Sequence, residues 1–103
     1  MATEVRIYTV KPGKLDEFVS IFVAEIMPTS AKYGVRVHAA WRNDEANEFV
    51  WVRSYDDEQA LSTYSNSPER ALYSSRSHDC LEQTQVRMVE SVIGPLPVAN
   101  EAP

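Results

Sequence analysis

The stretch VRIYTVKPGKLDEF, residues 5–18, predicts a strand, a tight turn and the start of a helix. Residues 4–10 alternate in the manner of a half-buried strand, and the Lys-Pro-Gly run at 11–13 ends it. The apolar residues that follow recur at spacings of three and four, the period of one helix face: Leu15, Phe18, Val19, Phe22 and Ile26. We expect Pro28 to interrupt this helix and Tyr33-Gly34 to end it.

The rest of the chain adds three strands and a second helical region. Residues 35–42 and 48–55 predict two strands joined by a polar hairpin loop, and residues 83–93 predict the last strand. Between them, Asp56-Asp57 predicts the cap of a helix that runs to about Ser65, and Pro68 begins a second segment that runs to about Cys80. This order predicts an α+β fold, the ferredoxin-like βαββαβ unit with an antiparallel four-stranded sheet.

Composition excludes several classes of partner. The 103 residues hold 15 Asp and Glu against 10 Lys and Arg, a net charge of -5, which argues against binding to nucleic acid or an anionic membrane. One cysteine excludes an internal disulfide framework, and we expect neither a signal peptide nor a membrane span. We therefore expect a small, soluble, cytoplasmic protein with one domain at 1–93 and a mobile, proline-containing tail at 94–103.

Alternation divides the strands into two faces, and both helices must cover the same one. We expect the small aliphatic set, which includes Val5 and Val52, to lie beneath the helices. The opposite face then carries four aromatic residues among arginines: Tyr8, Phe49, Trp51 and Tyr55. A face this aromatic is unsuited to water. A second copy of the sheet could cover it, so the pattern predicts a homodimer.

The opening stretch, with its Arg-x-Tyr strand and Lys-Pro-Gly turn, resembles the NIPSNAP family. Tyr33-Gly34, the run from Trp51 to Asp57, and Ser67-Pro68-Glu69 fit the same pattern, so the resemblance covers residues 4–93. Residues 71–73 depart from it, because Ala-Leu-Tyr stands where the family often has a tryptophan. The resemblance implies the dimeric α+β barrel superfamily, in which two ferredoxin-like sheets close face to face.

That superfamily implies several chemistries rather than one. It includes cofactor-independent oxygenases of aromatic or polyketide-like compounds, isomerases, polyketide cyclases and haem-degrading enzymes. The haem-degrading members pair a helix histidine with an asparagine on the first strand, where this chain has Tyr8 and Thr9. Haem binding through His78 therefore remains a minor alternative, and we predict no cofactor and no metal.

Two clusters are candidate sites. Arg6, Tyr8, His38, Trp51 and Arg53 predict an aromatic-walled pocket for a planar anionic or phenolic molecule. Phe49 and Tyr55 would extend its substrate-binding wall, with Arg53 stabilising developing charge and His38 moving a proton. The alternative is that these groups bury a dimer interface, with the arginines paired to Glu4, Glu48 or Glu90.

The second cluster is the polar end of the second helical region. Ser74 and Ser75 precede His78 by four and three residues, so the hydroxyls and the imidazole can face one another. His78 is then a candidate acid–base group at a pocket, and the alternative is a solvated helix end. Cys80 is expected to be a buried hydrophobe rather than a nucleophile.

Two functional hypotheses follow from these clusters. The first is a small-molecule enzyme without organic cofactor that oxygenates, isomerises or cyclises an aromatic or polyketide-like substrate. The second is a non-catalytic dimer that binds a ligand or a protein. The second is favoured if the aromatic and arginine side chains interdigitate with a partner and leave no cavity.

Overall fold

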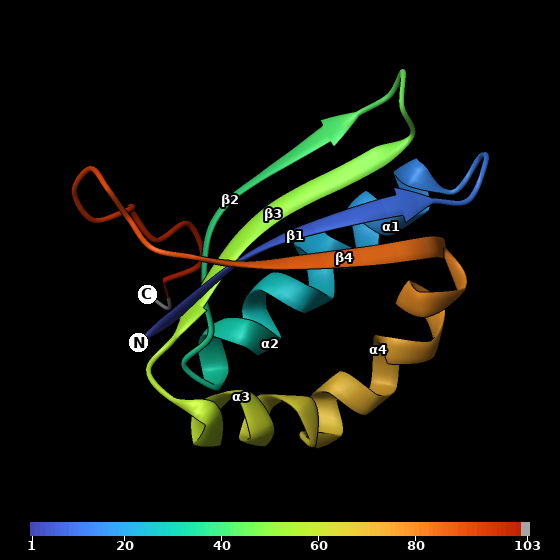
Figure 1. The fold of residues 1–103 in the computed structure, drawn as a ribbon. Coiled ribbons are helices and arrows are strands. Elements are labelled where there is room, and N and C mark those ends of the chain that lie inside the picture. The colour runs from blue at the N-terminus through green and yellow to red at the C-terminus, as the bar shows by residue number, and fades with distance from the viewer. Residues whose placement is uncertain (102–103) are drawn as a thin grey trace.

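The computed structural model describes residues 1–101 and has the predicted ferredoxin-like topology (Figure 1). The antiparallel sheet has the strand order β2-β3-β1-β4, and the helices lie on one side of it. The elements in chain order are β1 (Ala2–Val10), α1 (Leu15–Ile21), the π-helical segment η1 (Phe22–Ile26), α2 (Met27–Lys32), β2 (Arg36–Asn43), β3 (Glu48–Tyr55), α3 (Glu58–Ser65), α4 (Pro68–Asp79) and β4 (Leu81–Val89).

Helix boundaries follow from local chemistry. The Asp57 carboxylate accepts a hydrogen bond from the Ala60 backbone and begins α3, and the Ser67 hydroxyl does the same for Arg70 at the start of α4. Pro28 does not break the first helical region as predicted, because η1 precedes it and the proline falls in the first turn of α2, where its missing N–H is not needed. The predicted end at Tyr33-Gly34 is confirmed.

The predicted assignment of the two sheet faces is wrong. The aromatic face lies under the helices: the ring of Phe22 is 4.7 Å from Phe49 and 5.1 Å from Trp51, and Tyr8 meets Phe18 edge-on at 5.5 Å. The small aliphatic set, Val5, Ile7, Val50 and Val52, lies on the open face instead. Alternation separates two faces but does not say which one the helices cover, and only the larger side chains fill the space beneath α1 and η1.

The observed strands differ slightly from the predicted ones, and one irregularity affects a predicted site residue. β2 begins one residue later than expected, and a bulge between Val37 and Ala39 sets the direction of His38. β4 runs over Leu81–Val89 rather than 83–93, so the chain leaves the sheet earlier than predicted.

The segment after β4 packs back against the sheet instead of forming a free tail. Asn100 is 8% exposed; its side chain accepts a hydrogen bond from the Val37 N–H and donates to the carbonyls of Met27 and Val35. The Ala99 N–H adds a bond to the Val37 carbonyl. Residues 99 and 100 are therefore held against β2, and the last two residues of the predicted tail, 102–103, lie outside the described residues.

Candidate functional site

A cavity of about 260 Å³ lies between the covered face of the sheet and the helices. This volume is slightly below the range of ordinary ligand pockets, which is roughly 300 to 1,000 Å³. It suits a molecule of one or two rings. The sheet contributes Arg6, Tyr8, Trp51, Arg53, Leu81 and Thr84; the helices contribute Phe18, Ile26, Tyr64, Arg70, Tyr73, Ser74, Ser77 and His78, and Ser65 completes the lining.

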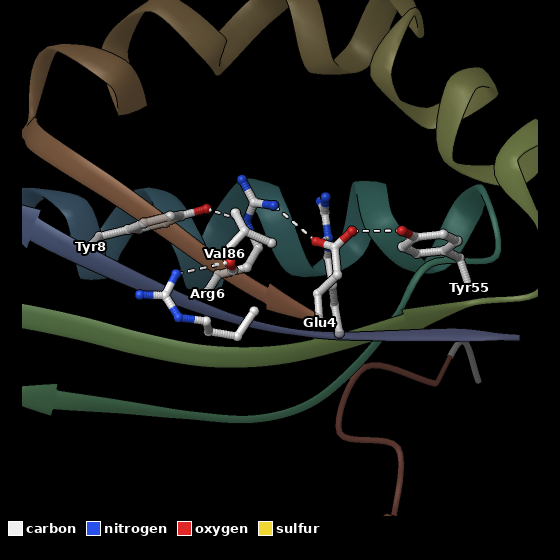
Figure 2. Close-up of polar contacts among 7 residues, drawn as sticks. Glu4, Arg6, Tyr8, Tyr55 and Val86 are labelled. Atoms are coloured by element: carbon white, nitrogen blue, oxygen red, sulfur yellow. Dashed lines mark hydrogen bonds and ion pairs between the residues drawn. The ribbon is translucent and has the colours of Figure 1, made fainter. Parts of the chain in front are cut away.

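Strand register brings the sheet side of this cavity together. β1 and β3 pair so that Arg6 lies opposite Trp51, and Glu4 opposite Arg53. One oxygen of Glu4, Oε1, accepts hydrogen bonds from Arg6 Nη1 and Arg53 Nε, each at 2.9 Å. The other, Oε2, accepts one from the Tyr55 hydroxyl at 2.6 Å. Figure 2 shows Arg6 between Tyr8 and Glu4, with Tyr55 on the far side of that carboxylate.

These contacts hold the Glu4 carboxylate in its charged form. Burial opposes ionisation, but the hydrogen bond from Tyr55 and the charge of Arg53, together with Arg6, lower the pKa of Glu4 below its ordinary range. Burial and the bond to Glu4 raise the pKa of Tyr55 to about 12, so its hydroxyl remains a donor. The pKa of Arg6 also rises, because Tyr8 and Glu4 outweigh the cost of burial.

Several donors beside the cavity have no acceptor among residues 1–101. The Nη groups of Arg53, which is 8% exposed, make no hydrogen bond there, and neither does Arg6 Nη2. The indole Nε1–H of Trp51 is buried without a partner in the same part of the chain. A buried donor without a partner costs about 1 to 3 kcal/mol. The buried indole N–H of Trp51 is not exposed to the cavity, so the Nη groups of Arg53 and Arg6 are the donors that the sheet side offers to a ligand with acceptor oxygens.

Aromatic rings and one cation form the helix side. The hydroxyls of Tyr64 and Tyr73 share a hydrogen bond of 2.8 Å, and burial followed by this bond raises the pKa of Tyr73. The Arg70 guanidinium lies over the Tyr64 ring, 5.9 Å from its centre. His78 reaches the same cavity from α4 and is otherwise exposed, so its imidazole has solvent on one side and the cavity on the other.

The structure brings together most, but not all, of the predicted site residues. Arg6, Tyr8, Trp51, Arg53 and His78 line the cavity. These side chains line a space between the sheet and the helices of one chain.

Phe49 and Tyr55 lie behind the wall rather than in it. Phe49 packs against the rings of Phe18 and Phe22, and Tyr55 binds Glu4. Both lie on the same face of the strands as the lining residues. The two-residue alternation of a strand therefore does not distinguish residues that line the cavity from residues that pack behind them.

His38 faces away from this cavity, on the open side of the sheet. Its Nδ1 lies 2.8 Å from the Pro97 carbonyl, which can only accept, so Nε2 accepts from the Ser54 hydroxyl at 2.7 Å. A second, apolar cavity of about 560 Å³ lies there, between Val5, Val52 and the segment after β4. The sequence grouped His38 with Arg6 because the bulge in β2 left no signal.

Glu4, Arg70 and the tyrosine pair were missed as site residues. Glu4 alternates with Arg6 and Tyr8, and this was the available signal, although the sequence suggested only an ion-pair partner. The residues on α3 and α4 carry no periodic apolar stripe that would have placed them over the sheet.

Other chemistries find little support in the described residues. Residues 1–101 contain no cluster of three or more His, Cys, Asp or Glu side chains that could hold a metal ion. Cys80 is fully buried and donates to a Glu17 oxygen, and burial with this bond raises the pKa of its thiol to about 11, as expected for an unreactive cysteine. Within the same range, no helix has the length and apolarity needed to cross a membrane.

The structure is thus an α+β domain with a cavity between its sheet and its helices. The family model described as antibiotic biosynthesis monooxygenase matches residues 1–73, and the chain belongs to that family. Comparison with curated proteins finds no match.

Solved structures agree with this fold. A NIPSNAP domain protein from Burkholderia xenovorans is 24% identical, with a TM-score of 0.75 over 92% of this chain and 99% of that one. A NIPSNAP family protein from Agrobacterium tumefaciens is 16% identical, with a TM-score of 0.77 over 93% and 98%. A candidate antibiotic biosynthesis monooxygenase from Nitrosomonas europaea is 13% identical, with a TM-score of 0.72 over 90% and 100%. The NIPSNAP resemblance is thus confirmed at the level of the fold.

Proposed function

We propose that this protein is a small-molecule enzyme that acts, without organic cofactor, on a planar aromatic or polyketide-like anion. The observation that carries the proposal is the sheet wall of the cavity, where Arg53 and Arg6 have guanidinium Nη groups with no acceptor among residues 1–101. A bound molecule with an enolate, phenolate or carboxylate oxygen would satisfy these groups. Membership of the monooxygenase family supports oxygenation, isomerisation or cyclisation as the reaction.

The residues divide into a binding part and a proton-transfer part. Arg6 and Arg53 would stabilise negative charge that develops on the substrate oxygen, since both are fixed before the reaction by Glu4. The rings of Tyr8 and Trp51 meet edge to face, 6.4 Å between centres, and would together form one wall beside the planar part of the molecule. His78 is the candidate base or acid, because it is the one histidine that lines the cavity and imidazole is the commonest general acid–base group in enzymes.

The functional unit would be a cytoplasmic homodimer. The open face of the sheet carries apolar residues, and the turn after β4 exposes Val92 and Ile93 at 95% and 89%. Apolar surface of this kind favours a partner. A second copy closing on this face would leave the cavity on the helix side accessible in each chain.

Ligand binding and turnover test the proposal with matched variants. Trp41 is exposed, so a Trp41→Phe background leaves Trp51 as the fluorescent reporter of the cavity. Naphthoates and hydroxynaphthoates are titrated, and products are sought by mass spectrometry under air. We expect Arg53→Met to weaken binding about tenfold and Arg36→Met, on the open face, to leave it unchanged.

The histidines provide a second matched pair. We expect His78→Asn to reduce turnover while His38→Asn retains it, because only His78 lines the cavity. Binding without turnover of any ligand would support the non-catalytic alternative. Absence of binding by every ligand would overturn the proposed function.

A further inference from the structure

Glu4 lies beneath the two arginines of the cavity and contacts both of them. Its Oε1 atom is shared by Arg6 Nη1 and Arg53 Nε at 2.9 Å each, and its side chain is 6% exposed. Oε2 is held by Tyr55, so the carboxylate has no freedom to turn away. A single carboxylate therefore neutralises one of two adjacent guanidinium charges.

We infer that Glu4 is a specificity-determining positioning residue that limits the sheet side of the cavity to one net positive charge and thereby selects a monoanionic ligand. The inference rests on the proposed function of this cavity. Two positive charges and one negative charge leave +1, which one carboxylate or phenolate would balance. A dianion would bring a second negative charge that has no counter-charge on the sheet side of the cavity, which is costly for a group withdrawn from bulk water.

The same contacts decide which arginine groups face a ligand. Glu4 occupies Arg53 Nε, while Arg6 uses Nη1 for Glu4 and Nε for the Tyr8 hydroxyl. The two Nη groups of Arg53 and Nη2 of Arg6 are left to bind an anion. The guanidinium carbon of Arg53 lies 5.5 Å from the centre of the Trp51 ring, and that of Arg6 lies 5.6 Å from the centre of the Tyr8 ring. An anion bound to these groups therefore has an aromatic ring beside it.

Charges on the helix side alter this balance little. Arg70 stacks over Tyr64 and is partly exposed, and His78 is exposed, so water screens both more than it screens Arg53, which is 8% exposed. Because of this difference in exposure, the charges that decide which anion binds lie on the sheet side, where Glu4 is.

A charge series tests the inference by calorimetric titration with three probes of one ring system. The probes are 2-naphthol, 2-naphthoate and 2,3-naphthalenedicarboxylate, which are neutral, singly and doubly charged near neutral pH. We expect wild type to prefer the monoanion to the dianion by about tenfold, and Glu4→Gln to shift that ratio about tenfold toward the dianion. Arg6→Met, which removes a positive charge, should weaken the binding of 2-naphthoate about tenfold and leave the affinity for 2-naphthol unchanged.

Matched variants separate charge from structural damage. Glu25→Gln alters a carboxylate paired with Arg76 on the surface, and Arg36→Met alters an arginine on the open face; both should keep the wild-type ratio. If Glu4→Gln does not fold, the wild-type ratio decides, because equal binding of 2-naphthoate and 2,3-naphthalenedicarboxylate would overturn the selection of a monoanion. Arg6→Met then separates charge from general damage, which would weaken neutral and charged probes alike. If no probe binds the wild-type chain, the proposed function fails. If 2-naphthoate binds and requires Arg53, but neither variant changes the charge preference, only the role of Glu4 is overturned.

Discussion

Arg6 Nε donates a hydrogen bond of 2.8 Å to the hydroxyl oxygen of Tyr8. The Tyr8 oxygen accepts this bond, so its own proton points elsewhere. In the described part of the chain, no acceptor is found for that proton. Because Glu4 fixes Arg6 in turn, the tyrosine is aligned through two side chains on the same strand. Tyr8 thus presents a donor to whatever occupies the cavity.

Tyr8→Phe should separate ligand binding from stability. Removing the hydroxyl deletes one donor to a bound anion and should weaken 2-naphthoate about tenfold. It also leaves Arg6 Nε without its acceptor, at a cost of about 1 kcal/mol in the free energy of unfolding. Titration and urea denaturation measure the two effects.

Tyr33→Phe is the control, since the Tyr33 hydroxyl binds Glu69 away from the cavity. It should leave affinity unchanged. Equal affinities for wild type and Tyr8→Phe would show that the tyrosine proton does not reach the ligand.

The sequence predicts the elements of this fold well because each carries a local signal. Three helix starts can be read from a few neighbouring residues: the apolar spacing that begins at Leu15, the cap at Asp57 and the proline at 68. The structure confirms all three. The alternation of β1 and β3 also groups Arg6, Tyr8, Trp51 and Arg53 correctly.

What the sequence cannot supply is information that depends on distant packing. Both faces of the sheet are apolar in part, so nothing local indicates that Phe22 packs on Phe49 rather than on Val50. The bulge that turns His38 to the open face has no residue signature, and Asn100 is far in sequence from the strand it binds. These three errors share one cause: each contact joins segments with no local marker of their pairing.

Asn100 should be more important for stability than its place near the chain end suggests. Its side chain satisfies the Val37 N–H and the carbonyls of Met27 and Val35 in a buried position. Asn100→Ala leaves these groups unpaired and should reduce the free energy of unfolding by about 2 to 4 kcal/mol. Asn66→Ala, at the exposed end of α3, should cost under about 1 kcal/mol. Equal urea midpoints for wild type and Asn100→Ala would contradict this role.

Acid should destabilise the protein in part through Glu4. The pKa of Glu4 is lower in the folded chain than its ordinary value of 4.5, so the folded state binds fewer protons there than the unfolded state. The stabilisation is complete above the unfolded pKa and is lost as the pH falls through the folded pKa. Glu4→Gln should be about 1 to 3 kcal/mol less stable at neutral pH and should lose less stability on acidification.

Urea denaturation at a series of pH values from neutral to acid measures this difference. The two stability curves should converge as the pH falls, because protonation removes from wild type what the substitution has already removed. Glu25→Gln supplies the comparison for a surface carboxylate. Parallel curves for wild type and Glu4→Gln would show that the ion pairs contribute no stability.

Assembly should depend on the open face of the sheet. Val5 lies near the middle of β1 on that face, between Val52 of β3 and Arg87 of β4. We expect the wild-type chain to have twice its 11.7 kDa mass by light scattering after gel filtration, and Val5→Glu to have the single-chain mass, because the new carboxylate would be buried between two sheets.

Val23→Glu is the matched control for assembly. Val23 is 61% exposed on η1, on the other side of the molecule, and its substitution should leave the dimer intact. Far-ultraviolet circular dichroism shows whether Val5→Glu keeps its secondary structure, so that loss of the dimer is not confused with unfolding. A wild-type chain that remains monomeric at high concentration would overturn the dimer.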